Sequence, residues 1–326
     1  MDDTDRKLML LIFEDPRMPI QELSKRLRIS RQTVSHRMDG LKKLGVFKDI
    51  RAAISFHYLG AVPVYIWGRT VGPSVEKILD RLGETELTDT AIVLGGNNLL
   101  VFGVPRNASE LESYVEFVKR AAEMTEPTVG LPCYGDGVNP PSYDKGRQKQ
   151  NYRALSPIDL RIIASLDDDA RKPTAEIAES VGLSARTVRR RLDRMKLEGL
   201  LTFDIPWDLP SGEDMFTLMF LNLRRGSDKG EVARRLLSKY QLRVTVVRSF
   251  SNLPDFLIGL LKSDKTREIR KILKEISEDE DVLAVTPNLI YLEREYWSWD
   301  QKLPADMTRF PGSTGKHDVR SMLKRR

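Results

Sequence analysis

The chain contains very little cysteine and histidine. Cys133 is the single cysteine among 326 residues, so the sequence excludes an intrachain disulfide and a thiolate metal cluster. Such cysteine usage is typical of proteins that work in a reducing cytoplasm. The three histidines, His36, His57 and His317, are scattered and favour no zinc site. We therefore expect a cytoplasmic protein that holds neither a metal nor another cofactor.

Long apolar stretches are also missing. No run approaches the length of about 20 residues that a membrane-spanning helix needs, and the acidic start Met1-Asp-Asp-Thr-Asp5 does not resemble a signal peptide. The sequence has no phosphate-binding loop, no HExxH-like pair and no serine flanked by glycines. We therefore expect neither a membrane protein nor an enzyme. A hydrophobic content of 40% is nevertheless sufficient for folded cores.

The net charge of +6 is small and unevenly distributed. Residues 302–326 carry seven Lys or Arg against two Asp, so the remainder of the chain is nearly neutral. A second basic stretch, 184–196, has six Lys or Arg against Asp193 alone. A solvated helix face would explain this stretch, and a local nucleic-acid surface is the alternative.

A long internal repeat is the main feature that the sequence does contain. Residues 5–45 align without a gap on residues 159–199, at an offset of 154 positions. A period of this size corresponds to a domain, so we expect a duplicated unit. Identical pairs include Asp5/Asp159, Asp15/Asp169, Arg17/Arg171, Ser30/Ser184, Thr33/Thr187, Val34/Val188 and Arg37/Arg191.

Each copy of the repeat predicts three helices. In the first copy, apolar residues recur at helical spacing over 4–15 and 20–27. A third helix is expected over 31–44, with Val34, Met38 and Leu41 facing the core. The second copy repeats these signals and ends its third helix at Gly199. Residues 46–56 predict a strand, as a wing or hairpin.

Three helices, with a short turn between the second and the third and polar residues in the N-terminal half of the third, are typical of a helix-turn-helix. The last helix of that motif enters the major groove, where Arg, Gln, Ser and His can meet base edges and Arg and Lys can neutralise phosphates. We therefore predict double-stranded DNA as the partner, with a purely structural bundle as the alternative. The predicted DNA-contacting residues are Ser30, Arg31, Gln32, Ser35, His36, Lys42, Ser184, Arg186, Thr187, Arg189, Arg190 and Arg194.

Three of the polar side chains on these helices have a second interpretation. His36 is also compatible with a solvent-facing position that has no role. Arg37 and Arg191 lie beside the apolar stripes, so we expect them to brace the fold. Glu22 and Glu176 are the acidic partners that we predict for them.

Both helix-turn-helix segments are followed by the order strand-helix-strand-strand-helix-strand, which is typical of the ferredoxin-like plan. We therefore predict an α+β fold by tandem duplication, with two winged helix-turn-helix domains and two ferredoxin-like βαββαβ domains. The sheet face without helices needs a partner, and the duplicate domain is the natural one. The expected ranges are 1–56 for the first winged helix-turn-helix, 57–134 for the first ferredoxin-like domain, 135–154 for a linker, 155–210 and 211–300 for the second pair of domains, and 301–326 for a basic tail without fixed structure.

The sequence resembles the leucine-responsive/asparagine (Lrp/AsnC, feast/famine) family of prokaryotic transcriptional regulators over about residues 2–134 and 155–293. This resemblance implies RAM-type ferredoxin-like domains and sequence-specific DNA binding. Family members usually dimerise, so a double chain resembles a fused dimer with two unlike reading helices, and further assembly into a homo-oligomer stays open. The resemblance rests on Asp5-Arg-Lys-Leu8, Asp15-Pro-Arg17, Glu22-Leu-Ser-Lys-Arg-Leu27, Ile29-Ser30-x-x-Thr-Val-x-x-Arg37-Met38 and Leu41-Lys-Lys-Leu-Gly-Val46, with their copies within 159–201.

The same resemblance implies control by a small-molecule effector such as an amino acid. Amino-acid-binding members often carry a Gly-x-x-Asp-like turn between the middle strands, and this chain departs from that pattern in both copies. Asp255 would face the ammonium of the effector, and the backbone of Gly95 and Gly96 would face its carboxylate. Ordinary β-turns are the alternative. The residues concerned are Gly95, Gly96, Asn97 and Asn98 in the first copy and Ser251, Asn252 and Asp255 in the second.

Two further classes of function remain as alternatives. Siroheme decarboxylases resemble this family in fold, but the His-Asn-Tyr-like segment expected near their middle strands is missing here. The corresponding turns read Gly95-Gly-Asn-Asn98 and Phe250-Ser-Asn-Leu253. A sequence-tolerant architectural DNA-binding protein is the other alternative, because the arginine-dense helix and the basic tail suit it.

Overall fold

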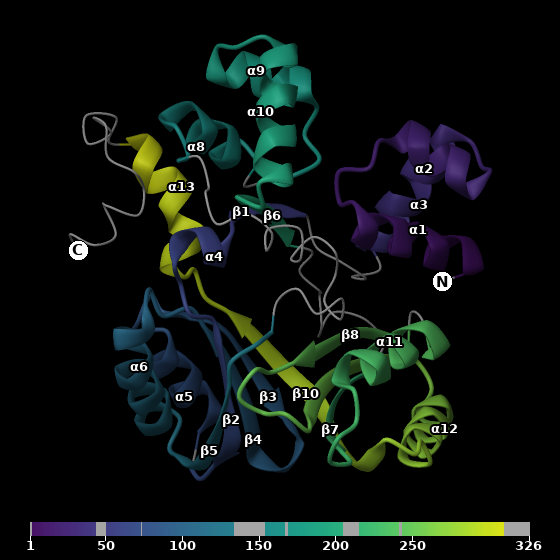
Figure 1. Ribbon diagram of the computed structural model, residues 1–326, viewed down its shortest axis with the longest axis vertical. Coiled ribbons are helices and arrows are strands. Elements are labelled where there is room, and N and C mark those ends of the chain that lie inside the picture. Colours follow the sequence, from purple (N-terminus) through teal and green to yellow (C-terminus); the bar gives the residue numbers. More distant parts are fainter. Residues whose placement is uncertain are drawn as a thin grey trace. The chain divides into compact units, whose positions relative to one another are not determined.

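The computed structural model describes residues 2–43, 50–72, 74–133, 154–166, 169–204, 215–240 and 243–309. The chain divides into two compact units, and both copies of the repeat contribute to each (Figure 1). We call residues 1–60, 140–208 and 299–326 the head unit. Residues 61–139 and 209–298 are the sheet unit. None of the described helices is long and apolar enough to cross a membrane.

The head unit contains two three-helix bundles, the first head and the second head. The first helix of each begins with a capping box, in which the side chain at the N-cap and the carboxylate three residues later each accept a backbone N–H. The apolar residues predicted on the third helices are buried. The first head comprises α1 (Asp3–Glu14), α2 (Ile20–Leu27) and α3 (Arg31–Lys43), and the second comprises α8 (Pro157–Ala164), α9 (Thr174–Val181) and α10 (Ala185–Leu197).

The strand that follows each head pairs with the strand that follows the other head. β1 (Arg51–Ile54) and β6 (Leu201–Asp204) form a two-stranded antiparallel sheet in which Ala52 lies opposite Phe203. Sequence patterning placed a wing or hairpin within residues 46–56, but the strand at 51–54 finds its partner in the other copy. Residues 44–49 lie outside the described residues. A short helix, α4 (Phe56–Leu59), follows β1.

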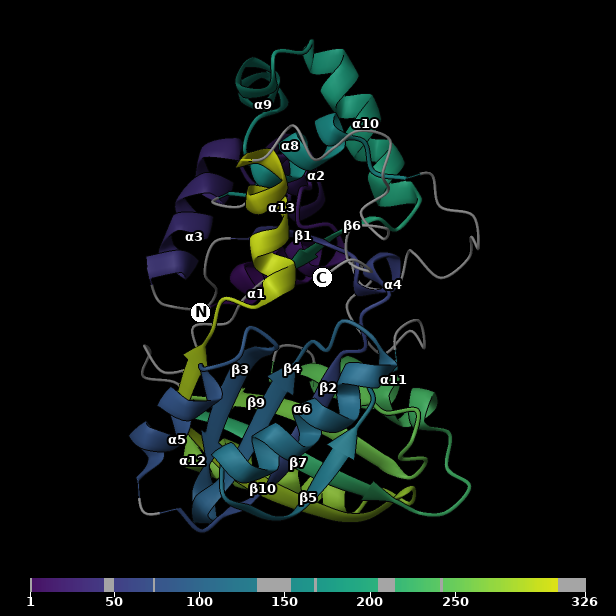
Figure 2. The ribbon, with the colours of Figure 1, turned by 90° about the vertical axis from the view of Figure 1, so that its left-hand side faces the viewer.

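The C-terminal region corrects another expectation. Residues 301–309 belong to helix α13 (Trp299–Arg309), so the prediction that the tail lacks fixed structure from 301 onward is wrong for this part. The helix packs against α8 and β1 within the head unit (Figure 2). Trp299 is buried at its start, and the helix continues through Pro304. Residues 310–326, and nearly all of the predicted linker 135–154, lie outside the described residues.

The sheet unit contains the order β-α-β-β-α-β twice, as the sequence predicted. The first copy comprises β2 (Val64–Thr70), α5 (Val75–Leu82), β3 (Thr88–Leu94), β4 (Asn98–Gly103), α6 (Ala108–Ala121) and β5 (Met124–Gly130), with the short turn η1 (Gly95–Asn97) between its middle strands. The second comprises β7 (Met215–Leu223), α11 (Lys229–Tyr240), β8 (Val244–Ser249), β9 (Phe256–Ser263), α12 (Thr266–Ser277) and β10 (Val282–Glu295).

All eight strands form one antiparallel sheet in the order β5-β2-β4-β3-β10-β7-β9-β8. Alternate residues of the strands pack under the helices and form one apolar core in each copy. The intervening residues carry aromatic rings that meet between the copies. Trp67 of β2 stacks on Phe256 of β9 with 5.3 Å between ring centroids, and it also contacts Phe220 and Phe250. The duplicate domain therefore covers the sheet face that the helices leave open.

The two copies join along two unlike seams. At the first seam, β3 and β10 pair directly, with Ile290 opposite Leu94 and Glu295 opposite Thr90. At the second seam, the ends of β5 and β8 form no ladder among the described residues but meet in an isolated bridge between Pro132 and Phe250. The side chain of Asn252 completes this seam, because it accepts the N–H of Leu131 at 2.8 Å and donates to the carbonyl of Val129 at 2.7 Å.

Candidate nucleic-acid interface

The shared Ser-x-x-Thr pattern builds the first turn of both third helices. Ser184 Oγ accepts the N–H of Thr187 at 3.2 Å, and the two hydroxyls lie 2.9 Å apart. Ser30 and Thr33 repeat this arrangement at 3.0 and 2.8 Å. The predicted contacts of Ser30, Ser184 and Thr187 with DNA stay predictions. The serine hydroxyls accept backbone N–H groups at the start of each helix, so these residues have a capping role whether or not they contact DNA.

The polar side chains on the outer face of α10 are arginines. Arg186, Arg189 and Arg190 are exposed, and none of them has an ion-pair or hydrogen-bond partner among the described residues. The structure therefore presents three guanidinium groups to solvent over the first half of the helix. Such a row can donate to phosphate oxygens or to guanine in a major groove.

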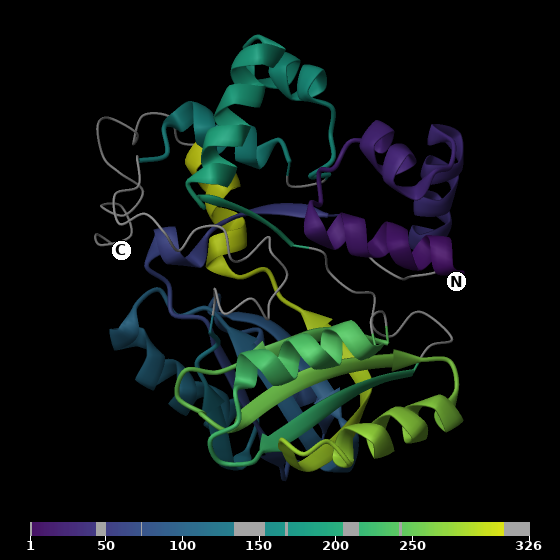
Figure 3. The same cartoon turned by 45° about the vertical axis from the view of Figure 1, so that its right-hand side comes forward.

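The first head (purple in Figure 3) carries a more mixed set of side chains at the corresponding positions of α3. Arg31, Gln32 and His36 are exposed, while Ser35 and Lys42 are half-buried. At the offset of 154 residues, Ser35 and His36 stand where the second head has Arg189 and Arg190. The first head thus offers varied hydrogen-bonding groups where the second head offers charge.

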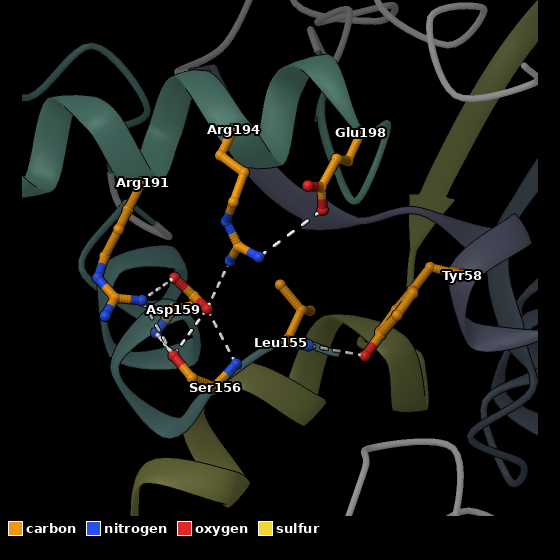
Figure 4. Close-up of polar contacts among 7 residues, drawn as sticks. All are labelled: Tyr58, Leu155, Ser156, Asp159, Arg191, Arg194 and Glu198. Atoms are coloured by element: carbon orange, nitrogen blue, oxygen red, sulfur yellow. Dashed lines mark hydrogen bonds and ion pairs between the residues drawn. The ribbon is translucent and has the colours of Figure 1, made fainter. Parts of the chain in front are cut away.

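Arg194 differs from the outward set because it is paired within the head, and its predicted contact with DNA stays a prediction. Its guanidinium donates to Asp159 Oδ2 at 2.7 Å and also lies 3.7 Å from Glu198 (Figure 4). Arg191 donates to the other oxygen of Asp159 at 2.8 Å. The Asp159 side chain is only 1% exposed, so one buried carboxylate holds two arginines of α10 against the start of α8. We call this set the second clamp.

The first clamp has the opposite composition. Arg37 of α3 donates to Asp2 Oδ2 and to Asp5 Oδ1, both at 2.7 Å. The prediction that Arg37 and Arg191 brace the fold agrees with this geometry, but Glu22 and Glu176 were the wrong partners. The true partners cap the first helix of each head, and only the packed bundle brings that cap beside the third helix.

One carboxylate in each clamp, Asp159 and Asp2, has a lowered pKa. Burial on its own would raise the pKa of Asp159, but hydrogen bonds from Ser156 and from Arg191, together with the charge of Arg194, outweigh it and lower the pKa. The backbone N–H of Asp5 and the guanidinium of Arg37 lower the pKa of Asp2 in the same way. Each clamp is therefore an ionic contact at neutral pH.

The predicted effector residues do not come together in one place. The turn at Gly95 lies against Leu289 and Tyr291 of β10, at the first seam. Ser251 and Asn252 bond to the end of β5, at the second seam. Asn98 is also occupied, because its amide donates to the carbonyl of Gly95 at 2.9 Å. No hydrogen bond among the described residues joins the two turns, so a site that combines Asp255 with Gly95 and Gly96 gains no support.

Comparisons with known proteins agree with the two heads. An AsnC-type helix-turn-helix domain matches residues 155–196, and a winged helix-turn-helix DNA-binding domain matches residues 1–48. An uncharacterized HTH-type transcriptional regulator of Pyrococcus furiosus is 24% identical over 123 residues, which are 36% of this chain and 81% of the relative. The HTH-type transcriptional regulator AldR of Mycolicibacterium smegmatis is 28% identical over 145 residues, which are 43% of this chain and 82% of AldR.

A solved structure matches nearly the whole chain. The siroheme decarboxylase NirDL superposes with a TM-score of 0.58 over 94% of this chain and 99% of its own, at 14% sequence identity. An identity this low shows the shared fold and carries no activity. The regulators, by contrast, are matched over most of their own length by less than half of this chain, as a duplicated unit requires. The chain therefore contains two helix-turn-helix DNA-binding domains in one polypeptide, one of them of the AsnC type, which agrees with the resemblance to the Lrp/AsnC family.

Proposed function

We propose that the protein is a transcription regulator whose two heads bind two unlike half-sites of one DNA duplex. In this proposal α3 and α10 enter separate major grooves, and the chain works as a single-polypeptide equivalent of a dimer. The α10 arginines supply phosphate contacts and guanine recognition, while Arg31, Gln32, Ser35 and His36 of α3 read a different sequence.

One observation carries this proposal. The first half of α10 exposes three arginines without a partner among the described residues, whereas the other two arginines of the helix are used inside the head. Repulsion among neighbouring guanidinium groups costs a few tenths of a kcal/mol per pair, and a bound anion would remove this cost. A nucleic acid backbone provides the missing negative charge.

Control by a small-molecule effector is a separate and weaker part of the proposal. The family resemblance motivates it, and the candidate polar groups are the Gly95–Asn98 turn at the first seam and Ser251 and Asn252 at the second, with Asp255 close by in sequence. Calorimetry with a mixture of the common amino acids tests it, and the absence of heat from every member of the mixture would end it.

Selection of bound sites from a random duplex library at near-physiological salt tests the main proposal. We expect enrichment of one site with two unlike halves. The variant Arg189→Ala/Arg190→Ala should lose enrichment of one half, and Arg31→Ala/Gln32→Ala should lose enrichment of the other.

Each alternative gives a different result in the same experiment. DNA that is retained without enrichment would point to a sequence-tolerant architectural protein. No retention of DNA would refute the proposal. Absorbance changes on adding an iron tetrapyrrole would then test whether the fold shared with NirDL extends to a shared ligand.

A further inference from the structure

The two heads exchange arginines through the turns that connect their first and second helices. Arg17, in the turn between α1 and α2, donates to the carbonyl of Ala170 and, at 3.1 Å, to that of Lys172. Arg171, in the turn between α8 and α9, donates to the carbonyl of Pro16 at 2.5 Å and to that of Met18 at 2.6 Å. Each guanidinium thus bridges two alternate carbonyls of the opposite turn.

These four hydrogen bonds obey the offset of the sequence repeat. Arg17 and Arg171 are 154 residues apart, and so are the two members of each carbonyl pair, Pro16 with Ala170 and Met18 with Lys172. The exchange is therefore reciprocal, as in a two-fold symmetric dimer interface. The shared Asp-x-Arg pattern marks the turn in both copies, although the sequence alone assigns it no role.

The environment of the two arginines makes the exchange specific. Both side chains are partly removed from water, and this burial lowers the pKa of each guanidinium. Asp15 and Asp169 each accept the backbone N–H two residues later, at 3.2 and 2.7 Å, and so fix the turns. The planar guanidinium holds its N–H donors in a fixed fork that spans two carbonyls, whereas a lysine ammonium is a compact charge on a flexible stem.

Two further contacts join the heads at the same place. Lys196 of α10 lies 3.1 Å from Asp15 Oδ1, so the second reading helix touches the turn of the first head directly. The N–H of Ala170 donates to the carbonyl of Ile50, just before β1, at 2.7 Å. The described contacts between the two bundles therefore centre on these turns and on the β1–β6 pair.

We propose that the Arg17–Arg171 exchange sets the spacing between the two half-sites that the protein accepts. Two rigidly connected reading helices can enter two major grooves together only at one separation. Loosely connected heads would tolerate several separations. Arg17 and Arg171 act here as positioning residues and touch no base. This inference rests on the proposed function, because spacing has meaning only if both heads bind DNA.

A spacing series tests the inference with the full-length protein. The two selected half-sites are placed with spacers that vary in single base pairs over about one helical turn, roughly 10 base pairs. The unchanged protein should prefer one spacing by about tenfold or more, as expected when only one geometry permits both contacts. Arg17→Met/Arg171→Met should flatten this preference while binding to an isolated half-site stays unchanged.

Arg161→Met is the matched control, because Arg161 also donates to a backbone carbonyl, that of Val181 at 3.1 Å, but stays within one head. This variant should keep the spacing preference. A flat profile in the control, or an unchanged preference in the double variant, would overturn the inference.

A distance measurement separates this inference from the proposed function. Spin labels are placed at Gln32→Cys and Arg186→Cys in a Cys133→Ser background, without DNA. The distance distribution between the labels should be narrow with Arg17 and Arg171 present and clearly broader in the double Met variant. Equal widths would refute the positioning role even if DNA binding is confirmed. If the double Met variant broadens the distribution but the protein binds no DNA, the structural role of the Arg17–Arg171 exchange is supported and only the proposed function is refuted.

Discussion

The two clamps perform the same task with opposite charge. The first head holds one arginine, Arg37, between two carboxylates, whereas the second head holds one carboxylate, Asp159, between two arginines. Asp2 of the first copy corresponds to Ser156 of the second, and Gly40 corresponds to Arg194. Both copies therefore keep an ionic contact between the first and third helices, but carboxylates are in the majority in the first clamp and arginines in the second. The second head is therefore the more basic one, both inside the clamp and on its outer face.

Removal of the charge at the centre of the second clamp should have the largest effect. Asp159→Asn leaves Arg191 and Arg194 without their buried counterion, and we expect a loss of about 3 kcal/mol in the free energy of unfolding at pH 7. Urea unfolding checks this value. Asp5→Asn is the matched variant in the first head, and it should cost clearly less because Arg37 keeps Asp2.

The stability that Asp159 contributes should also depend on pH. The pKa of Asp159 is lower in the folded protein than in the unfolded chain, so its contribution is complete above the unfolded value of about 3.9. The contribution disappears as the pH falls through the lower pKa of the folded state. The stability difference between the unchanged protein and Asp159→Asn should therefore shrink below about pH 4. A difference that persists in acid would show that packing, not charge, holds the clamp.

The outer faces of the reading helices should give the next largest difference. Arg189→Ala/Arg190→Ala should weaken DNA binding by about 30-fold, equivalent to roughly 2 kcal/mol, because each lost arginine contact contributes about 1–3 kcal/mol. The matched variant Ser35→Ala/His36→Ala should cost less affinity but should change the preferred sequence. Gel-shift titrations at several salt concentrations distinguish the two cases.

The salt dependence of binding sharpens this contrast. Each phosphate contact contributes about 0.9 to the slope of log affinity against log salt. The arginine variant should therefore flatten the slope by up to about 2, and the Ser35/His36 variant should leave it unchanged. Equal slopes for both variants would contradict the division between a charge-dominated head and a sequence-reading head.

The ends of the second helices should give the smallest difference. Both lie in the left-handed region, at Arg28 with φ of 56° in the first head and at Gly182 with φ of 70° in the second. Gly182→Ala should cost about 1 kcal/mol, because a side chain there is strained even though nothing lies within 4 Å of it. Arg28→Ala should be nearly neutral, since that position already bears a side chain. Thermal unfolding of both variants provides the comparison.

The helices and the order of the strands were predictable because they depend on local signals. Apolar periodicity defined α2 and α3, whose bounds lie within one residue of the expected ranges 20–27 and 31–44. The buried residues of the third helices followed from the same spacing. Capping residues such as Ser184 likewise act within one turn, so their signal survives without knowledge of the fold.

The features that were missed depend on contacts between distant segments. No local pattern shows that β1 pairs with β6, that Asp159 faces Arg194, or that Asn252 bonds to the end of β5. The helix at 299–309 was missed for the same reason, because its stability comes from packing against α8 and β1. The repeat does contain one signal for the contact between the heads. Asp15 and Arg17 are identical to their copies, Asp169 and Arg171, although none of the four lies on an apolar helix face.

The pairing of β1 with β6 limits how the two halves of the gene can evolve. Each strand supplies the other with backbone partners and apolar cover, so a substitution at Ala52 changes the surroundings of Phe203. The outer faces of α3 and α10 have no such mutual dependence. In tandem relatives of this chain, we expect paired changes along β1 and β6 and independent change on the two reading helices. The DNA preference of each head can thus change independently, while β1 and β6 must change together to keep their pairing.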